Sequence, residues 1–166
     1  MENTENKGYI LGCQNNSDIC HYRCCDQSTT TSYDFCQENA ILLYPGEWEK
    51  EVKERKKHIL ISDDDNHTGK LGYCDKENFD QSQCNPLQNF KPLDCHSYPF
   101  FPVIADGKLK LAIDSKRCPL SKDIQQLREH YRFILNEWMR VVGNNEKVKT
   151  WIGNISLDGY EIIDNF

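Results

Sequence analysis

The residues in this chain best suited to chemistry are its cysteines. The 166-residue sequence contains nine of them, Cys13, Cys20, Cys24, Cys25, Cys36, Cys74, Cys84, Cys95 and Cys118. Thiolates bind zinc or iron, and a site usually takes four of them or a mixture with histidine. The local pattern Cys20-x3-Cys24-Cys25 lets one loop supply two or three ligands. Because successive side chains point in different directions, Cys24 and Cys25 indicate either two metal centres or one ligand beside one packed thiol.

The later cysteines have no spacing that identifies a class of site. Cys74, Cys84, Cys95 and Cys118 match no zinc finger, zinc ribbon or ferredoxin pattern. The start, MENTENKGYILG, has neither a basic nor an apolar signal region, so we expect a cytoplasmic protein with reduced thiols. An odd cysteine count also leaves one thiol over in a fully disulfide-bonded monomer. The pattern therefore predicts metal or redox chemistry without naming the metal.

Five segments follow one another in a distinctive order. They are Cys20-x3-Cys24-Cys25, Ile41-Leu-Leu-Tyr-Pro-Gly-Glu47, Cys74-x9-Cys84, Lys91-Pro-Leu-Asp-Cys95-His-Ser-Tyr-Pro-Phe100 and Cys118-Pro119. This order resembles the YkgJ-type cysteine-cluster family, the CxxCxxCC zinc- or iron-chelating proteins. The family's Pro-x-x-Cys-Arg-x-Phe-Pro block is similar to residues 92–99, with His96 in the arginine place and Tyr98 in the aromatic place. The resemblance covers residues 13–120 and implies a metal- or iron–sulfur-binding module with no single established reaction.

Six cysteines form the predicted ligand set. They are Cys20, Cys24, Cys25, Cys84, Cys95 and Cys118. Because six thiolates exceed a single zinc site, an iron–sulfur cluster is favoured slightly over one or more zinc ions. Cys36 is expected to be a small buried hydrophobic residue, whereas Cys13 and Cys74 are left open as ligands.

Three further residues are candidates for the surroundings of the metal. His21 and His96 each follow a predicted ligand directly, so either can hydrogen-bond to a thiolate, although simple exposure to solvent explains them as well. Tyr98 can shield a cluster from water, and packing in a core explains it equally well.

The elements that must position these residues predict an α+β fold. Lys108 to Ile113 alternates apolar and polar residues after Asp106-Gly107, the favoured pair for a type I′ turn, and predicts a short β-hairpin with Val103 to Ile104. Residues 121–142 predict an amphipathic helix that Ser121 caps. Residues 47–57 predict a surface helix with Trp48 and Val52 on a narrow apolar stripe.

The predicted architecture is a small, loop-rich cysteine-cluster domain organised around a metal site. Residues 1–120 would form the metal-binding domain, and residues 121–166 a C-terminal helix and tail packed on the same domain. No apolar stretch is long enough to cross a membrane.

Charge and composition restrict the function further. The net charge of −6 repels phosphate backbones, so we expect no nucleic-acid partner. The lack of a long apolar stretch also leads us to expect no membrane partner, while a protein partner stays open. The sequence favours a metal-binding protein acting in electron transfer or as an accessory to a protein-modifying enzyme. Two alternatives are an exported disulfide-stabilised domain and a cysteine-dependent enzyme, with Cys24 or Cys25 as nucleophile and His21 or His96 as base.

Overall fold

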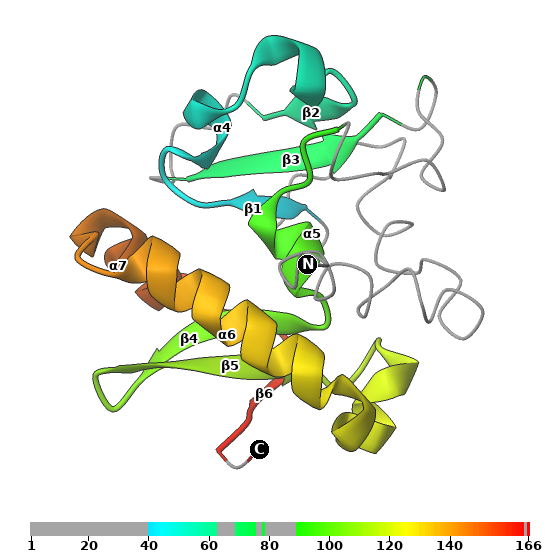
Figure 1. Cartoon of the computed structure of the whole chain (residues 1–166), viewed down its shortest axis with the longest axis vertical. Helices are drawn as coiled ribbons and strands as arrows, with labels where there is room; N and C mark the ends of the chain where they lie inside the picture. Colours follow the sequence, from blue (N-terminus) through cyan, green and yellow to red (C-terminus); the bar gives the residue numbers. More distant parts are fainter. Residues whose placement is uncertain (1–39, 63–68, 76–77, 79–88, 165) are drawn as a thin grey trace, which may run out of the picture. The chain divides into compact units, whose positions relative to one another are not determined.

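Short antiparallel strands are interspersed with helices along the chain (Figure 1). The computed structural model describes residues 40–62, 69–75, 78, 89–164 and 166. The elements are β1 (Ile41–Leu43), α4 (Glu47–Lys50), η3 (Lys53–Lys56), β2 (Ile59–Ile61), β3 (Lys70–Cys74), α5 (Leu93–Ser97), β4 (Phe100–Ala105), β5 (Lys108–Asp114), η5 (Pro119–Leu127), α6 (Arg128–Val142), α7 (Glu146–Gly153) and β6 (Tyr160–Ile162). The predicted α+β class is confirmed, whereas organisation around a metal stays a prediction.

The described residues divide into two compact units between Cys95 and His96. The first unit contains β1, α4, η3, β2 and β3 and ends at Cys95, and the second runs from His96 to the C-terminus. Helix α5 contributes its first three residues to the first unit and its last two to the second.

The first unit is built on a sheet in which β3 is central. Among the described residues its strand order is β1-β3-β2, and both pairings are antiparallel. Gly72 lies opposite Ile41 on one side and Ile61 on the other. A Cβ at Gly72 would lie 2.9 Å from Cδ1 of Leu43, so the absence of a side chain lets the sheet pack tightly there. The apolar cluster of this unit, called here the sheet cluster, contains Ile41, Leu43, Ile59 and Phe90.

The prediction of one continuous helix over residues 47–57 is wrong, because the chain forms two short helices there. Helix α4 ends at Lys50, and the chain is extended at Glu51 and Val52 before the 3₁₀ helix η3. The carboxylate of Glu51 accepts hydrogen bonds from the Val52 amide and the Arg55 guanidinium, which holds the break in place. Trp48 packs on the sheet cluster, but Val52 is 58% exposed and joins no apolar stripe.

The second unit contains the predicted hairpin, which is confirmed and longer than expected. Strands β4 and β5 pair from Phe100↔Ile113 to Ala105↔Lys108. Asp106 and Gly107 both have positive φ, 53° and 70°, as a type I′ turn requires. Strand β6 extends the sheet by pairing with β5.

The predicted helix over residues 121–142 is confirmed only from Arg128 onward. Residues Pro119–Leu127 form 3₁₀ helix instead, interrupted at Asp123, where φ is −130° and ψ is 74°. Ser121 does not cap α6, because it lies inside η5, where its hydroxyl donates to the carbonyl of the preceding Cys118. The buried stripe of α6 repeats every four residues at His130, Ile134, Trp138 and Val142. Figure 1 shows α6 lying across β4 and β5.

The C-terminal tail packs on this unit, whereas the predicted packing of residues 121–166 on a domain formed by residues 1–120 stays a prediction. Helix α7 buries Trp151 and Ile152, and the rings of Trp138 and Trp151 stack at 6.5 Å between centroids. The amide of Ile163 donates to the Leu111 carbonyl, which continues the sheet beyond β6. The tail is therefore part of the core of the second unit.

Candidate metal-binding cysteines

The structure describes four of the nine predicted site residues. Cys95, His96 and Tyr98 lie in or just after α5, and Cys118 precedes η5. The others lie outside the described residues, namely Cys20, His21, Cys24, Cys25 and Cys84, together with Cys13 and Cys36. The geometry of the candidate site therefore rests on Cys95, Cys118 and the undecided Cys74.

Cys95 is the third residue of α5 and is half-buried. Its side chain packs against the sheet cluster, which apolar residues from β1 and β2 form together with Phe90. Pro92 precedes the helix and is buried, a placement that suits the restricted φ of proline. Cys95 is thus held on a short helix against an apolar surface.

Two carboxylates fix the first turn of that helix. Glu47 Oε1 accepts a hydrogen bond from the Leu93 amide at 2.6 Å, and Asp94 Oδ2 accepts one from the Leu42 amide at 2.8 Å. The Leu93 amide is one of the donors that a helix N-terminus leaves without an intrahelical acceptor. Both bonds join residues close to Cys95 with the segment from β1 to α4. The position of α5 in this unit is therefore set by specific polar contacts as well as by packing.

Glu47 is a buried acid, and sequence reasoning missed it. The prediction placed it on a surface helix, where the helix dipole favours carboxylates, but its side chain is only 6% exposed. Burial raises its pKa to about 8, and the amides of Leu93 and Tyr44, which both donate to it, partly oppose that rise. The neighbouring charge of Asp94 raises the pKa further, and that of Lys50 lowers it. A carboxyl buried at this cost indicates a local constraint, and no pattern in the sequence distinguishes it from an exposed glutamate.

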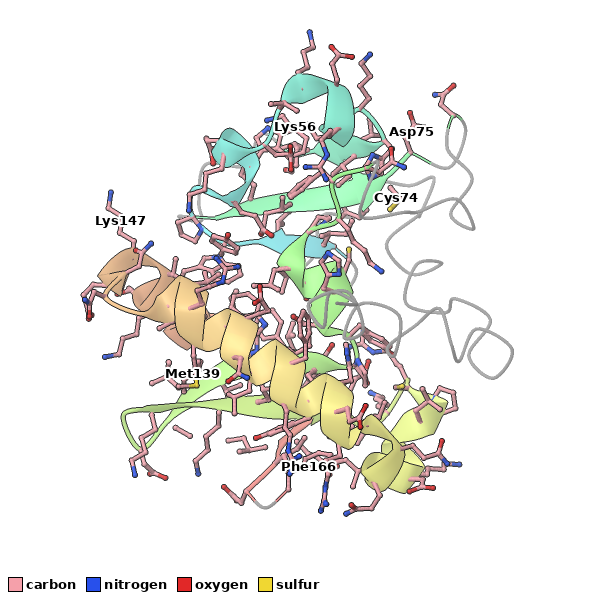
Figure 2. The ribbon with its side chains drawn as sticks, in the orientation of Figure 1. Lys56, Cys74, Asp75, Met139, Lys147 and Phe166 are labelled. Atoms are coloured by element: carbon pink, nitrogen blue, oxygen red, sulfur yellow. The ribbon has the colours of Figure 1, made fainter. Side chains whose placement is uncertain are left out.

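Cys74 packs against the same sheet cluster as Cys95. It is the last residue of β3, where it pairs with Ile59, and it is half-buried. Figure 2 shows it beside Asp75 at the end of this strand. Two thiols of the first unit therefore share one apolar surface, one from a strand and one from a helix.

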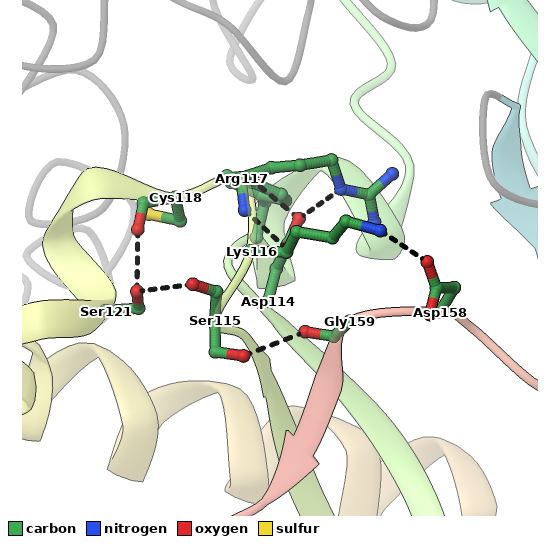
Figure 3. A network of polar contacts seen from close by, with 9 residues as sticks. Asp114, Ser115, Lys116, Arg117, Cys118, Ser121, Asp158 and Gly159 are labelled. Atoms are coloured by element: carbon green, nitrogen blue, oxygen red, sulfur yellow. Dashed lines mark hydrogen bonds and ion pairs between the residues drawn. The ribbon is translucent and has the colours of Figure 1, made fainter.

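Cys118 belongs to the second unit and is 4% exposed. The turn before it is held by Asp114, whose side chain is fully buried and accepts from the backbone amide of Arg117 at 3.0 Å and from its Nε at 2.7 Å. The Ser121 hydroxyl donates to the Cys118 carbonyl at 2.7 Å (Figure 3). Cys118 thus sits in a turn that polar contacts fix on both sides.

Two of the three predicted neighbours of the metal, His96 and Tyr98, are described, and their surroundings differ. The hydroxyl of Tyr98 donates a hydrogen bond to Asp114 Oδ2 at 3.1 Å. The backbone carbonyl oxygen of Tyr98 lies 3.0 Å from Nε2 of His130. Tyr98 therefore contacts the carboxylate that holds the Cys118 turn. His96 occupies the last turn of α5 and is half-buried. The role of each beside a thiolate stays a prediction.

The three cysteines that the structure describes are of the ligand type that soft metals prefer, but they are fewer than the four ligands that such a site usually takes. Cys74, Cys95 and Cys118 form no disulfide with one another, and thiolates are the ligands that zinc and iron–sulfur centres prefer. Within the described ranges, no three His, Cys, Asp or Glu side chains are grouped so that they could hold an ion. A four-ligand site would therefore need cysteines from outside the described part of the chain.

Comparison with known proteins identified no relative of this chain. No family model, no curated protein and no solved structure matches the chain. The similarity to the cysteine-cluster family thus stays an interpretation of the residues themselves. Among the helices of the described residues, none is long and apolar enough to cross a membrane.

Proposed function

We propose that this protein binds a metal through a cysteine cluster, as an iron–sulfur cluster or as one or more zinc ions. The observation that carries the proposal is the pair Cys74 and Cys95, two thiols that pack on the one sheet cluster. Apolar packing excludes water from one side of a thiolate site, and the surrounding hydrophobic shell influences the potential of a bound cluster. The remaining donors would come from the other predicted ligands, Cys20, Cys24, Cys25, Cys84 and Cys118.

The proposed ligands are those that the sequence predicts, namely Cys20, Cys24, Cys25, Cys84, Cys95 and Cys118. Cys74, which the sequence left open, is a further candidate because it packs on the same sheet cluster as Cys95. A bound iron–sulfur cluster would supply one-electron chemistry, whereas zinc would supply structural cross-linking. The fixed turns before Cys95 and Cys118 support these two assignments, because a rigid backbone lowers the entropy lost when a ligand is held. In the cytoplasm, where we place the protein, the thiols would stay reduced.

The biological role that we propose is electron transfer or assistance to a protein-modifying enzyme. The net charge of −6 supports a protein partner over nucleic acid, since an acidic surface repels phosphates. We propose no membrane partner.

Elemental analysis and an absorbance spectrum on the full chain, purified anaerobically without a histidine tag, test the proposal. Several irons per chain with thiolate-to-iron absorption would identify an iron–sulfur protein, and zinc without colour a structural site. Absence of both metals would overturn the proposal. Mass spectrometry with and without reductant then separates the alternatives, because a disulfide-stabilised domain gains hydrogens on reduction and a thiol enzyme does not.

Serine substitutions identify the ligands. Cys95→Ser and Cys118→Ser are each expected to lower the metal content per chain, since serine is a poor ligand for soft metals. Cys36→Ser is the matched control, because Cys36 is predicted to be a packed thiol, and it should leave the metal content unchanged. If all three variants kept the metal content of the wild type, Cys95 and Cys118 would be excluded from the ligand set.

A further inference from the structure

The side chains of Glu47 and Asp94 accept hydrogen bonds from backbone amides on both sides of the contact between α5 and the segment from β1 to α4. The carboxyl of Glu47 joins two peptide amides, Tyr44 at 3.1 Å through Oε2 and Leu93 at 2.6 Å through Oε1. Asp94 Oδ2 binds the amide of Leu42, which lies at an edge of the sheet because β1 pairs only with β3 among the described strands. We name these two side chains the carboxylate clamp.

The clamp connects two segments that are far apart in sequence. The bond from Leu93 to Glu47 spans 46 residues, and the bond from Leu42 to Asp94 spans 52. The two bonds run in opposite directions, because each segment supplies one carboxylate and one amide. Such reciprocal bonds fix both the position and the rotation of a short helix better than either does alone.

Burying the carboxyl of Glu47 costs free energy of desolvation, which argues against a merely space-filling role for this side chain. Glu47 is 6% exposed, and burial removes the hydration of its carboxyl group. The hydrogen bonds that the amides of Tyr44 and Leu93 donate to it replace that hydration only in part. The charge of Asp94 further disfavours the ionised form of Glu47. An apolar side chain would fill the space without this cost but would leave the Leu93 amide without the acceptor that Glu47 provides.

We propose that the carboxylate clamp positions the Cys95 thiolate for the metal. Cys95 follows Asp94 directly and lies in the first turn of α5, whose first amide, that of Leu93, donates to Glu47. When the clamp fixes that turn, it fixes the direction in which the thiolate leaves the helix. Glu47 and Asp94 are positioning residues in this assignment and touch no metal. The assignment rests on the proposed metal-binding function.

Titration of the reduced, metal-free full chain with Co²⁺ tests the clamp. Cobalt replaces zinc in thiolate sites, and its sulfur-to-cobalt absorption reports how many thiolates bind and in what geometry. Glu47→Gln keeps the size of the side chain but has one acceptor oxygen where two amides need one each. We expect it to weaken cobalt binding by about 10- to 100-fold, the usual effect of losing a group that orients a ligand. We also expect a changed absorption per bound cobalt at saturation, which loss of stability alone would not produce.

Glu49→Gln is the matched control. Glu49 lies on the same helix α4, but its side chain is 58% exposed and its nearest cation, Lys70, is 3.7 Å away. This variant should keep the wild-type affinity and spectrum.

A second pair of variants separates hydrogen bonding from charge and covers a failure of Glu47→Gln to fold. Asp94→Asn keeps an oxygen for the Leu42 amide and should behave as wild type, whereas Asp94→Ala removes it and should show the altered cobalt spectrum. If Asp94→Ala and Glu47→Gln both give the wild-type spectrum and affinity, the assignment is overturned while metal binding stands. A wild-type chain that takes up no cobalt overturns metal binding and the clamp with it.

Discussion

The indole Nε1 of Trp138 donates a hydrogen bond to the hydroxyl of Ser97 at 2.7 Å, and neither side chain is exposed to solvent. This bond joins α6 to the end of α5 within the second unit. Because the indole N–H is a donor only, it needs an acceptor once it is buried. The pair therefore combines a large apolar contact with one obligatory polar partner.

Loss of the serine hydroxyl should destabilise the second unit. Ser97→Ala removes the acceptor of the buried indole, so we expect the free energy of unfolding in urea to fall by about 1–3 kcal/mol. Ser156→Ala, at an exposed position, is the control and should change it by less than about 0.5 kcal/mol. In a Trp138→Phe background the Ser97 substitution should cost less, since no indole donor is left. An equal cost in both backgrounds would contradict the assignment.

The Asp114 carboxylate should contribute more than the exposed ion pairs around it. Asp114→Ala would leave the Arg117 guanidinium, 21% exposed, without this partner and would remove the acceptor of the Tyr98 hydroxyl. We expect a loss of about 3 kcal/mol in unfolding free energy. Lys116→Ala breaks an exposed pair with Asp158 in the same region (Figure 3) and should cost less than about 1 kcal/mol. Similar losses in the two variants would show that Asp114 acts only as another surface charge.

The raised pKa of Glu47 predicts a pH dependence of stability. Its pKa is about 8 in the folded chain and near the model-peptide value of 4.5 when unfolded, so between these values the folded state binds more protons. The contribution of Glu47 is therefore fully present below pH 4.5 and is lost as the pH rises through 8. Urea unfolding of the wild type and Glu47→Gln across this range measures it. We expect the difference in stability between the two to shift against the wild type as the pH rises, and a constant difference would contradict the raised pKa.

Two glycines should respond to alanine in opposite ways. At Gly72 a new Cβ would lie 2.9 Å from Leu43 and 3.2 Å from Ile59, so Gly72→Ala should destabilise the first unit by about 1–3 kcal/mol. Gly153 ends α7, is exposed, and has no atom within 4 Å of an added Cβ. Gly153→Ala should raise stability by up to about 1 kcal/mol, because alanine favours the helix. Thermal unfolding followed by circular dichroism distinguishes the two, and a stabilised Gly72→Ala would contradict the tight packing on β3.

The sequence alone determined the features that depend on local patterns. Asp106-Gly107 predicted the hairpin because few residue pairs adopt two successive positive φ angles, and the structure has both. The apolar stripe of residues 121–142 predicted the helix that the structure has from Arg128 onward, with Ile134, Trp138 and Val142 on its buried face, but it did not include the buried His130. The nine cysteines and their order along the chain predicted metal chemistry, which remains a proposal.

The tertiary structure decided what depends on contacts between distant residues. Strand β3 and its pairing with β1 and β2 were not predicted, since a three- to five-residue strand gains its stability from partners that no local window contains. The helix expected after Gly46 breaks at Glu51, where side-chain bonds compete with the helical backbone. Glu47 is buried because α5 brings the Leu93 amide to its carboxyl, and such a bond is determined by packing and not by residue type.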